Sequence, residues 1–80
     1  MPEWLEKTPW PAQGIATGTS PEDYRWGYLY LYRDGRAVFR EDERPTLREI
    51  EARWGHYFRW AYQTRRIDSR YPQWAVGLLS

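Results

Sequence analysis

The sequence has no cysteine, one histidine and no long apolar run. The absence of cysteine excludes disulfides, thiolate metal ligands and thiol nucleophiles. No apolar stretch approaches the roughly 18 residues that a membrane-spanning helix needs. The first seven residues include acids and no apolar segment, so they do not resemble a signal peptide. We therefore expect a cytoplasmic protein that does not enter a membrane.

Side chains in a catalytic arrangement are equally scarce. His56 has no second histidine or carboxylate three or four residues away, as a metal pair would require, and no neighbour that would make it a general base. The serines lie outside any nucleophile-elbow pattern, and no glycine-rich phosphate loop is present. The consecutive acids Glu41–Glu43 would not converge on one reacting atom. We expect no enzyme activity, no cofactor and no metal site.

Aromatic residues are abundant, with six tryptophans, seven tyrosines and two phenylalanines among 80 residues. A chain of this length forms one small domain, near the lower limit of what a single core can stabilise. Each aromatic side chain can bury on the order of 150–250 Å², which offsets that handicap. An ordered fold is therefore expected.

The net charge of +1 conceals an asymmetry between the two halves of the chain. Residues 1–43 have a net charge of −3, from five basic and eight acidic groups, whereas residues 44–80 have a net charge of +4, from seven and three. Eleven of the twelve basic residues are arginine, whose planar fork suits protein interfaces and nucleic acids. The alternative is that the genome simply favours arginine codons, which would give the same number of arginines.

Residues 1–23 are predicted to form an extended arm, rich in proline and tryptophan, that packs on a single small domain at residues 24–80. Prolines remove amide donors and keep the chain extended, and two tryptophans are too apolar for a free tail. A short edge strand within Gln13–Thr19 is one way in which this arm could join a sheet.

The central segment, about residues 24–41, predicts a β-hairpin because Asp34-Gly35 separates two alternating runs. A two-residue loop would place Arg40 among the leucines. A three-residue loop over Arg33–Gly35 instead pairs Leu31 with Ala37 and Leu29 with Phe39 on one face. A slip of one residue would move every side chain to the other face. We therefore favour the register that puts the leucines, Ala37 and Phe39 on one face and the tyrosines and arginines on the other.

A helix is predicted over about residues 46–67. Thr46 with Glu49 forms a capping box, and a regular 3,4 spacing predicts a buried stripe of Leu47, Ile50, Trp54, Tyr57 and Ala61, with Phe58 at its edge. Residues 74–79 are either a third strand or a docked apolar tail. The expected fold class is α+β: a small antiparallel sheet, completed by a strand from one terminus, packed on one long helix.

Two surfaces are candidates for binding a partner. The first is the second face of the hairpin, with Tyr28, Tyr30, Tyr32, Arg36 and Arg40. Tyrosine and arginine are enriched at interface hot spots and also contact single-stranded nucleic acid. The alternative is cross-strand stacking that only stabilises the sheet.

The second candidate is the outer side of the helix. Arg48, Arg59 and Arg66 lie within about 20° of each other on a helical wheel, and Trp60 and Ile67 form a second apolar stripe beside them. The arginines alone are typical of a solvated face. A tryptophan from elsewhere in the chain, or a second copy in a homodimer, could cover Trp60 and Ile67.

Two classes of function remain. The expected one is a non-catalytic protein-interaction module, such as a small inhibitor, adaptor or assembly subunit, whose partner is another protein. The alternative is a nucleic-acid-binding protein that contacts DNA or RNA with the Tyr/Arg face or the arginine-rich helix. A sequence pI near 8.1 argues against the alternative.

Overall fold

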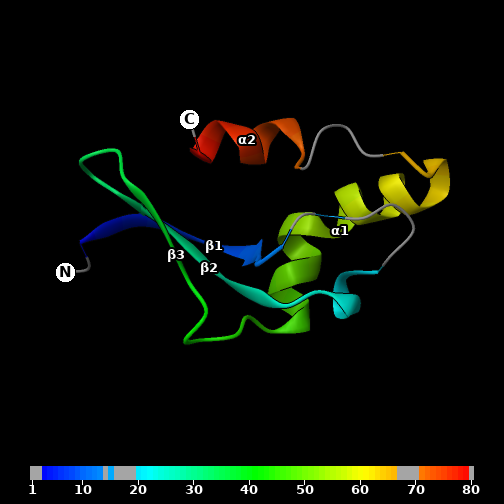
Figure 1. Ribbon diagram of the computed structural model, residues 1–80, viewed down its shortest axis with the longest axis horizontal. Coiled ribbons are helices and arrows are strands. Elements are labelled where there is room, and N and C mark those ends of the chain that lie inside the picture. The colour runs from blue at the N-terminus through cyan, green and yellow to red at the C-terminus, as the bar shows by residue number, and fades with distance from the viewer. Residues whose placement is uncertain (1–2, 14, 16–19, 67–70, 80) are drawn as a thin grey trace.

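The computed structural model describes residues 3–13, 15, 20–66 and 71–79, which form a three-stranded antiparallel sheet and two helices (Figure 1). The predicted α+β class is confirmed. In chain order the elements are β1 (Trp4–Pro11), a 3₁₀ turn η1 (Pro21–Asp23), β2 (Trp26–Tyr32), β3 (Ala37–Arg40), α1 (Leu47–Thr64) and α2 (Gln73–Leu79).

The hairpin β2–β3 has the predicted register. Leu31 lies opposite Ala37 and Leu29 lies opposite Phe39. The Tyr32 amide donates to the carbonyl of Arg36 at 2.9 Å, which leaves three residues in the loop. Gly35, the last of them, has a φ of 91°, a conformation that costs a glycine little.

The third strand comes from the N-terminal segment that we expected to be an arm. β1 pairs with β2, with Lys7 opposite Tyr30 and Trp10 opposite Gly27, so β2 is the central strand. β1 is an edge strand, the position in a sheet that tolerates Pro9 and Pro11, since neither can donate to a ladder. Most of the predicted strand at residues 13–19 lies outside the described residues.

Helix α1 begins where its capping residues predict. The Thr46 side chain accepts a hydrogen bond from the Glu49 amide at 3.2 Å. The helix ends at Thr64, earlier than predicted, because Arg65 adopts a left-handed conformation with φ 54°. Ile50, Trp54, Tyr57, Phe58 and Ala61 are buried as expected. Leu47 is 55% exposed, contrary to the predicted stripe, because α1 begins to pack on the core only one turn later, at Ile50.

The C-terminal apolar run is a helix rather than a strand or a tail. α2 begins directly after the buried Pro72 and places Ala75 in the core, fully buried. Leu78, three residues further on and therefore on the same side of the helix, packs against that core. A run of this length does not distinguish a buried helix from a strand by periodicity alone.

Trp54 of α1 is at the centre of the core and is fully buried. Its ring lies 5.3 Å from Trp10 and 5.8 Å from Trp26, and its Nε1 donates to the carbonyl of Pro9 at 2.7 Å. Because Trp10 pairs with Gly27, the neighbour of Trp26, the two rings leave opposite faces of the sheet. α1 therefore crosses the end of the sheet, where β1 ends and β2 begins, and the β2–β3 turn lies away from it (Figure 1).

Candidate partner-binding surface

Tyr28 is not on the exposed Tyr/Arg surface that the sequence predicts. It is only 4% exposed, because α1 covers the end of the sheet from which it projects. Its hydroxyl donates to the Glu49 carboxylate at 2.6 Å. Burial and this hydrogen bond raise the pKa of Tyr28, and the same hydrogen bond lowers the pKa of Glu49. Tyr28 is therefore a structural contact between sheet and helix.

The other four predicted residues of the sheet are in contact as two pairs. The Arg40 guanidinium lies 5.5 Å from the ring centroid of Tyr30, and the Arg36 guanidinium lies 4.8 Å from that of Tyr32. Trp4 of β1, which sequence reasoning did not assign to this face, meets the Tyr30 ring edge-on at 5.7 Å. We call Trp4, Tyr30, Tyr32, Arg36 and Arg40 the Tyr/Arg face.

The charges around the Tyr/Arg face differ in how they are paired. Arg36 forms an ion pair with Asp34 at 2.7 Å, and hydrogen bonds from its backbone and side chain lower the pKa of Asp34. Lys7 pairs with Glu43 at 3.1 Å, which raises the lysine's pKa. Among the described residues, Arg40 takes part in no ion pair. Arg40 is therefore a cation placed over the Tyr30 ring, without an acidic partner among the described residues.

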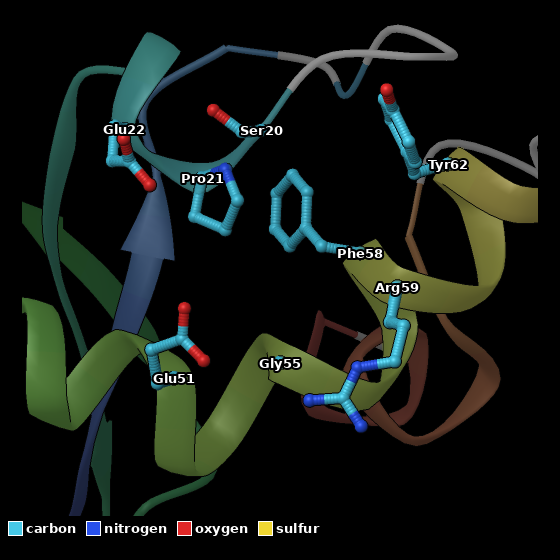
Figure 2. A pocket seen from close by; sticks show the side chains of 8 residues that line it. All are labelled: Ser20, Pro21, Glu22, Glu51, Gly55, Phe58, Arg59 and Tyr62. Atoms are coloured by element: carbon cyan, nitrogen blue, oxygen red, sulfur yellow. The ribbon is translucent and has the colours of Figure 1, made fainter.

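The predicted residues of the helix lie on a separate surface. Arg59 is exposed and Trp60 is 38% exposed, whereas Ile67 lies outside the described residues. Arg59 borders a hollow of about 390 Å³ between η1 and α1, in which Phe58 points toward Pro21 while the arginine points away from it (Figure 2). The lining residues are Ser20, Pro21, Glu22, Glu51, Gly55, Phe58, Arg59 and Tyr62. This hollow contains charges of both signs.

Trp60 borders a second hollow, of about 300 Å³, between α1 and α2. Its lining residues are His56, Tyr57, Trp60, Pro72, Gln73 and Trp74. A tryptophan from elsewhere in the chain was one of the two expected neighbours of Trp60, and Trp74, which the sequence placed in a strand or a tail and not in a helix, lines the same hollow. The α2 helix is what places the two tryptophans together.

In the described part of the chain, no group of three or more histidine, cysteine or acidic side chains could hold a metal ion. No helix there is long and apolar enough to cross a membrane. Comparison with known proteins found no matching family model, no similar curated protein and no similar solved structure.

Proposed function

We propose that the protein is a non-catalytic protein-interaction module, such as a small inhibitor, adaptor or assembly subunit, that acts in the cytoplasm and binds a partner protein through the Tyr/Arg face. The supporting observation is the stacking of Arg36 on Tyr32 and of Arg40 on Tyr30, with Trp4 against the same tyrosine. Tryptophan, tyrosine and arginine are the residue types most enriched at interface hot spots.

The arginine side chains of the Tyr/Arg face are already held in place before a partner binds, which favours binding. Immobilising a flexible side chain on association costs roughly 0.5–1.5 kcal/mol. Here each guanidinium already rests on a ring, and Asp34 holds the side chain of Arg36 in place. A partner would therefore meet a surface that needs little further ordering. Arg40 would supply a charge-assisted contact to an acidic group on the partner.

The Tyr/Arg face lies outside the core, so binding and folding depend on different residues. None of its five residues belongs to the buried core cluster or to the partly buried residues packed on it. β3, which contains Arg40 and begins directly after Arg36, is also an edge strand of the sheet. Substitutions on this face should therefore leave the fold nearly intact.

Capture from a lysate of the native host, treated with nuclease to remove nucleic-acid bridges, tests the proposal. We expect the wild-type protein to retain a partner protein that the double variant Tyr30→Ala/Arg36→Ala does not retain. Trp60→Ala, on the other surface, is the matched control and should retain it. Circular dichroism and sedimentation of all three proteins exclude unfolding and a change in self-association as causes. Equal capture by the wild type and the double variant would overturn the proposal.

A further inference from the structure

The groove between α1 and α2 has two tryptophan walls that come from different helices. Trp60 of α1 and Trp74 of α2 both line this hollow of about 300 Å³, and each is 38% exposed. Large aromatic side chains are ordinarily buried when the fold has a place for them. A groove that keeps two indoles accessible is suited to a ligand with a flat face.

Contacts beneath the groove hold its aromatic walls in position. The Trp74 ring lies 5.0 Å from the ring of the fully buried Trp54, and the Arg53 guanidinium lies 4.2 Å from the Trp74 centroid. Trp60 lies 5.9 Å from the buried ring of Tyr57. Since the rings are already ordered, a flat ligand would stack on them at a small entropic cost.

The stretch of chain that carries Trp60 has an excess of positive charge. From Ala52 to Arg66 the chain has four arginines and no acidic residue, although the whole protein carries only +1. The four are Arg53, Arg59, Arg65 and Arg66. All are exposed, and among the described residues only Arg53 forms an ion pair, with Glu6 at 3.5 Å. Arg53 lies over a wall of the groove, and the excess of positive charge on this stretch of chain favours an anion near it.

The lining of the groove itself contains no aspartate, glutamate, lysine or arginine. A matching ligand is thus uncharged where it enters the groove and negatively charged where it passes the arginines. A nucleobase joined to a phosphate backbone has this distribution, whereas a proline-rich peptide without acids lacks the charge and an acidic peptide without aromatic residues lacks the flat rings. A duplex keeps its bases stacked and cannot offer them.

We propose that α1 and α2 form a binding site for single-stranded nucleic acid, with a base against Trp60 and Trp74 and the flanking phosphates near the arginines between Arg53 and Arg66. Stacking on aromatic rings tolerates any base sequence, so the site should show little sequence preference. The site is separate from the Tyr/Arg face and does not depend on the proposed protein partner.

Fluorescence anisotropy of labelled single strands of about 15 nucleotides, oligo-dT and oligo-U, tests the site. At about 50 mM salt we expect binding that weakens steeply toward 200 mM, and much weaker binding to a duplex of the same length. Trp60→Ala should weaken binding by about tenfold. Arg59→Ala should weaken it less and reduce the salt slope by about 0.7.

Two more variants keep the test decisive. Gln73→Glu adds a carboxylate at the groove without removing a packed ring and should weaken binding of both single strands. Trp4→Ala, on the Tyr/Arg face, should leave the affinity unchanged. No retention of either single strand at 50 mM salt, equal affinity for the duplex, or an equal loss with Trp4→Ala would overturn the proposal. Those results would leave the protein-binding proposal intact, because it concerns the other surface.

Discussion

The hydroxyl of Tyr28 donates a 2.6 Å hydrogen bond to the carboxylate of Glu49, and this contact joins the central strand to the first turn of α1. Lys7 lies 4.1 Å above the Tyr28 ring, on the same face of the sheet. Thr46, the N-cap residue, also donates its hydroxyl to Glu49, at 3.3 Å. Glu49 thus receives hydrogen bonds from the sheet and from its own helix terminus.

Removing the Tyr28 hydroxyl should destabilise the fold. We expect Tyr28→Phe to lower the melting temperature by about 5 °C, because a hydrogen bond to a charged group is lost from a buried position. Tyr32→Phe is the matched control, since within the described residues the Tyr32 hydroxyl forms no hydrogen bond, and it should change the melting temperature by less than about 3 °C. Equal shifts in a thermal scan would show that the contact contributes nothing specific.

The same contact makes stability depend on pH. The pKa of Glu49 is lowered in the folded state, chiefly by the Tyr28 hydroxyl, so the unfolded chain takes up this proton first. The stabilisation is therefore present above the unfolded pKa of about 4.3 and is lost as the pH falls toward the folded value. Urea unfolding at pH 7 and pH 3 should show that the wild type and Tyr28→Phe differ less at pH 3. A difference that grows on acidification would contradict this reasoning.

Gly27 is required by close packing in the sheet. A Cβ atom at this position would lie 2.3 Å from the backbone oxygen of Arg40 and 2.8 Å from the Phe39 ring. Since a strand backbone cannot move away easily, Gly27→Ala should reduce the free energy of unfolding by about 3 kcal/mol or more.

The control for this variant is another glycine of the chain. A Cβ at Gly55, in α1, would meet only the Glu51 carboxylate, at 3.4 Å, an ordinary contact distance. Gly55→Ala should therefore increase the free energy of unfolding by up to about 1 kcal/mol, since alanine favours a helix. Urea denaturation of both variants measures the two changes. An equal loss of unfolding free energy in both would show that the close approach at Gly27 is not the cause.

The parts of the fold that depend on local chemistry could be predicted from the sequence. Asp34-Gly35 sets the hairpin register, and Thr46 sets the start of α1, because each acts through backbone groups a few residues away. The third strand was harder to place, since Pro9 and Pro11 are typical of an extended arm as well as of an edge strand.

The burial of Tyr28 could not be predicted, because it depends on where the helix crosses the sheet. Alternation along β2 describes two faces but not how far along the strand each face is covered. Trp54 contacts Trp10 on one face of the sheet and Trp26 on the other, so both faces are covered at this end of the sheet. Tyr30 and Tyr32, further along the same strand, stay only half-buried for the same reason.

Site-specific photo-crosslinking in the native host tests the central claim most directly. A photoreactive residue in place of Tyr32 reports on the Tyr/Arg face, and one in place of Tyr62, which is 56% exposed on α1, is the matched control. We predict that a partner protein is joined at position 32 and not at position 62. Adding excess wild-type protein should abolish the adduct, whereas adding Tyr30→Ala/Arg36→Ala should not. A protein adduct at position 62 with none at position 32, or adducts only between copies of this chain, would contradict the account.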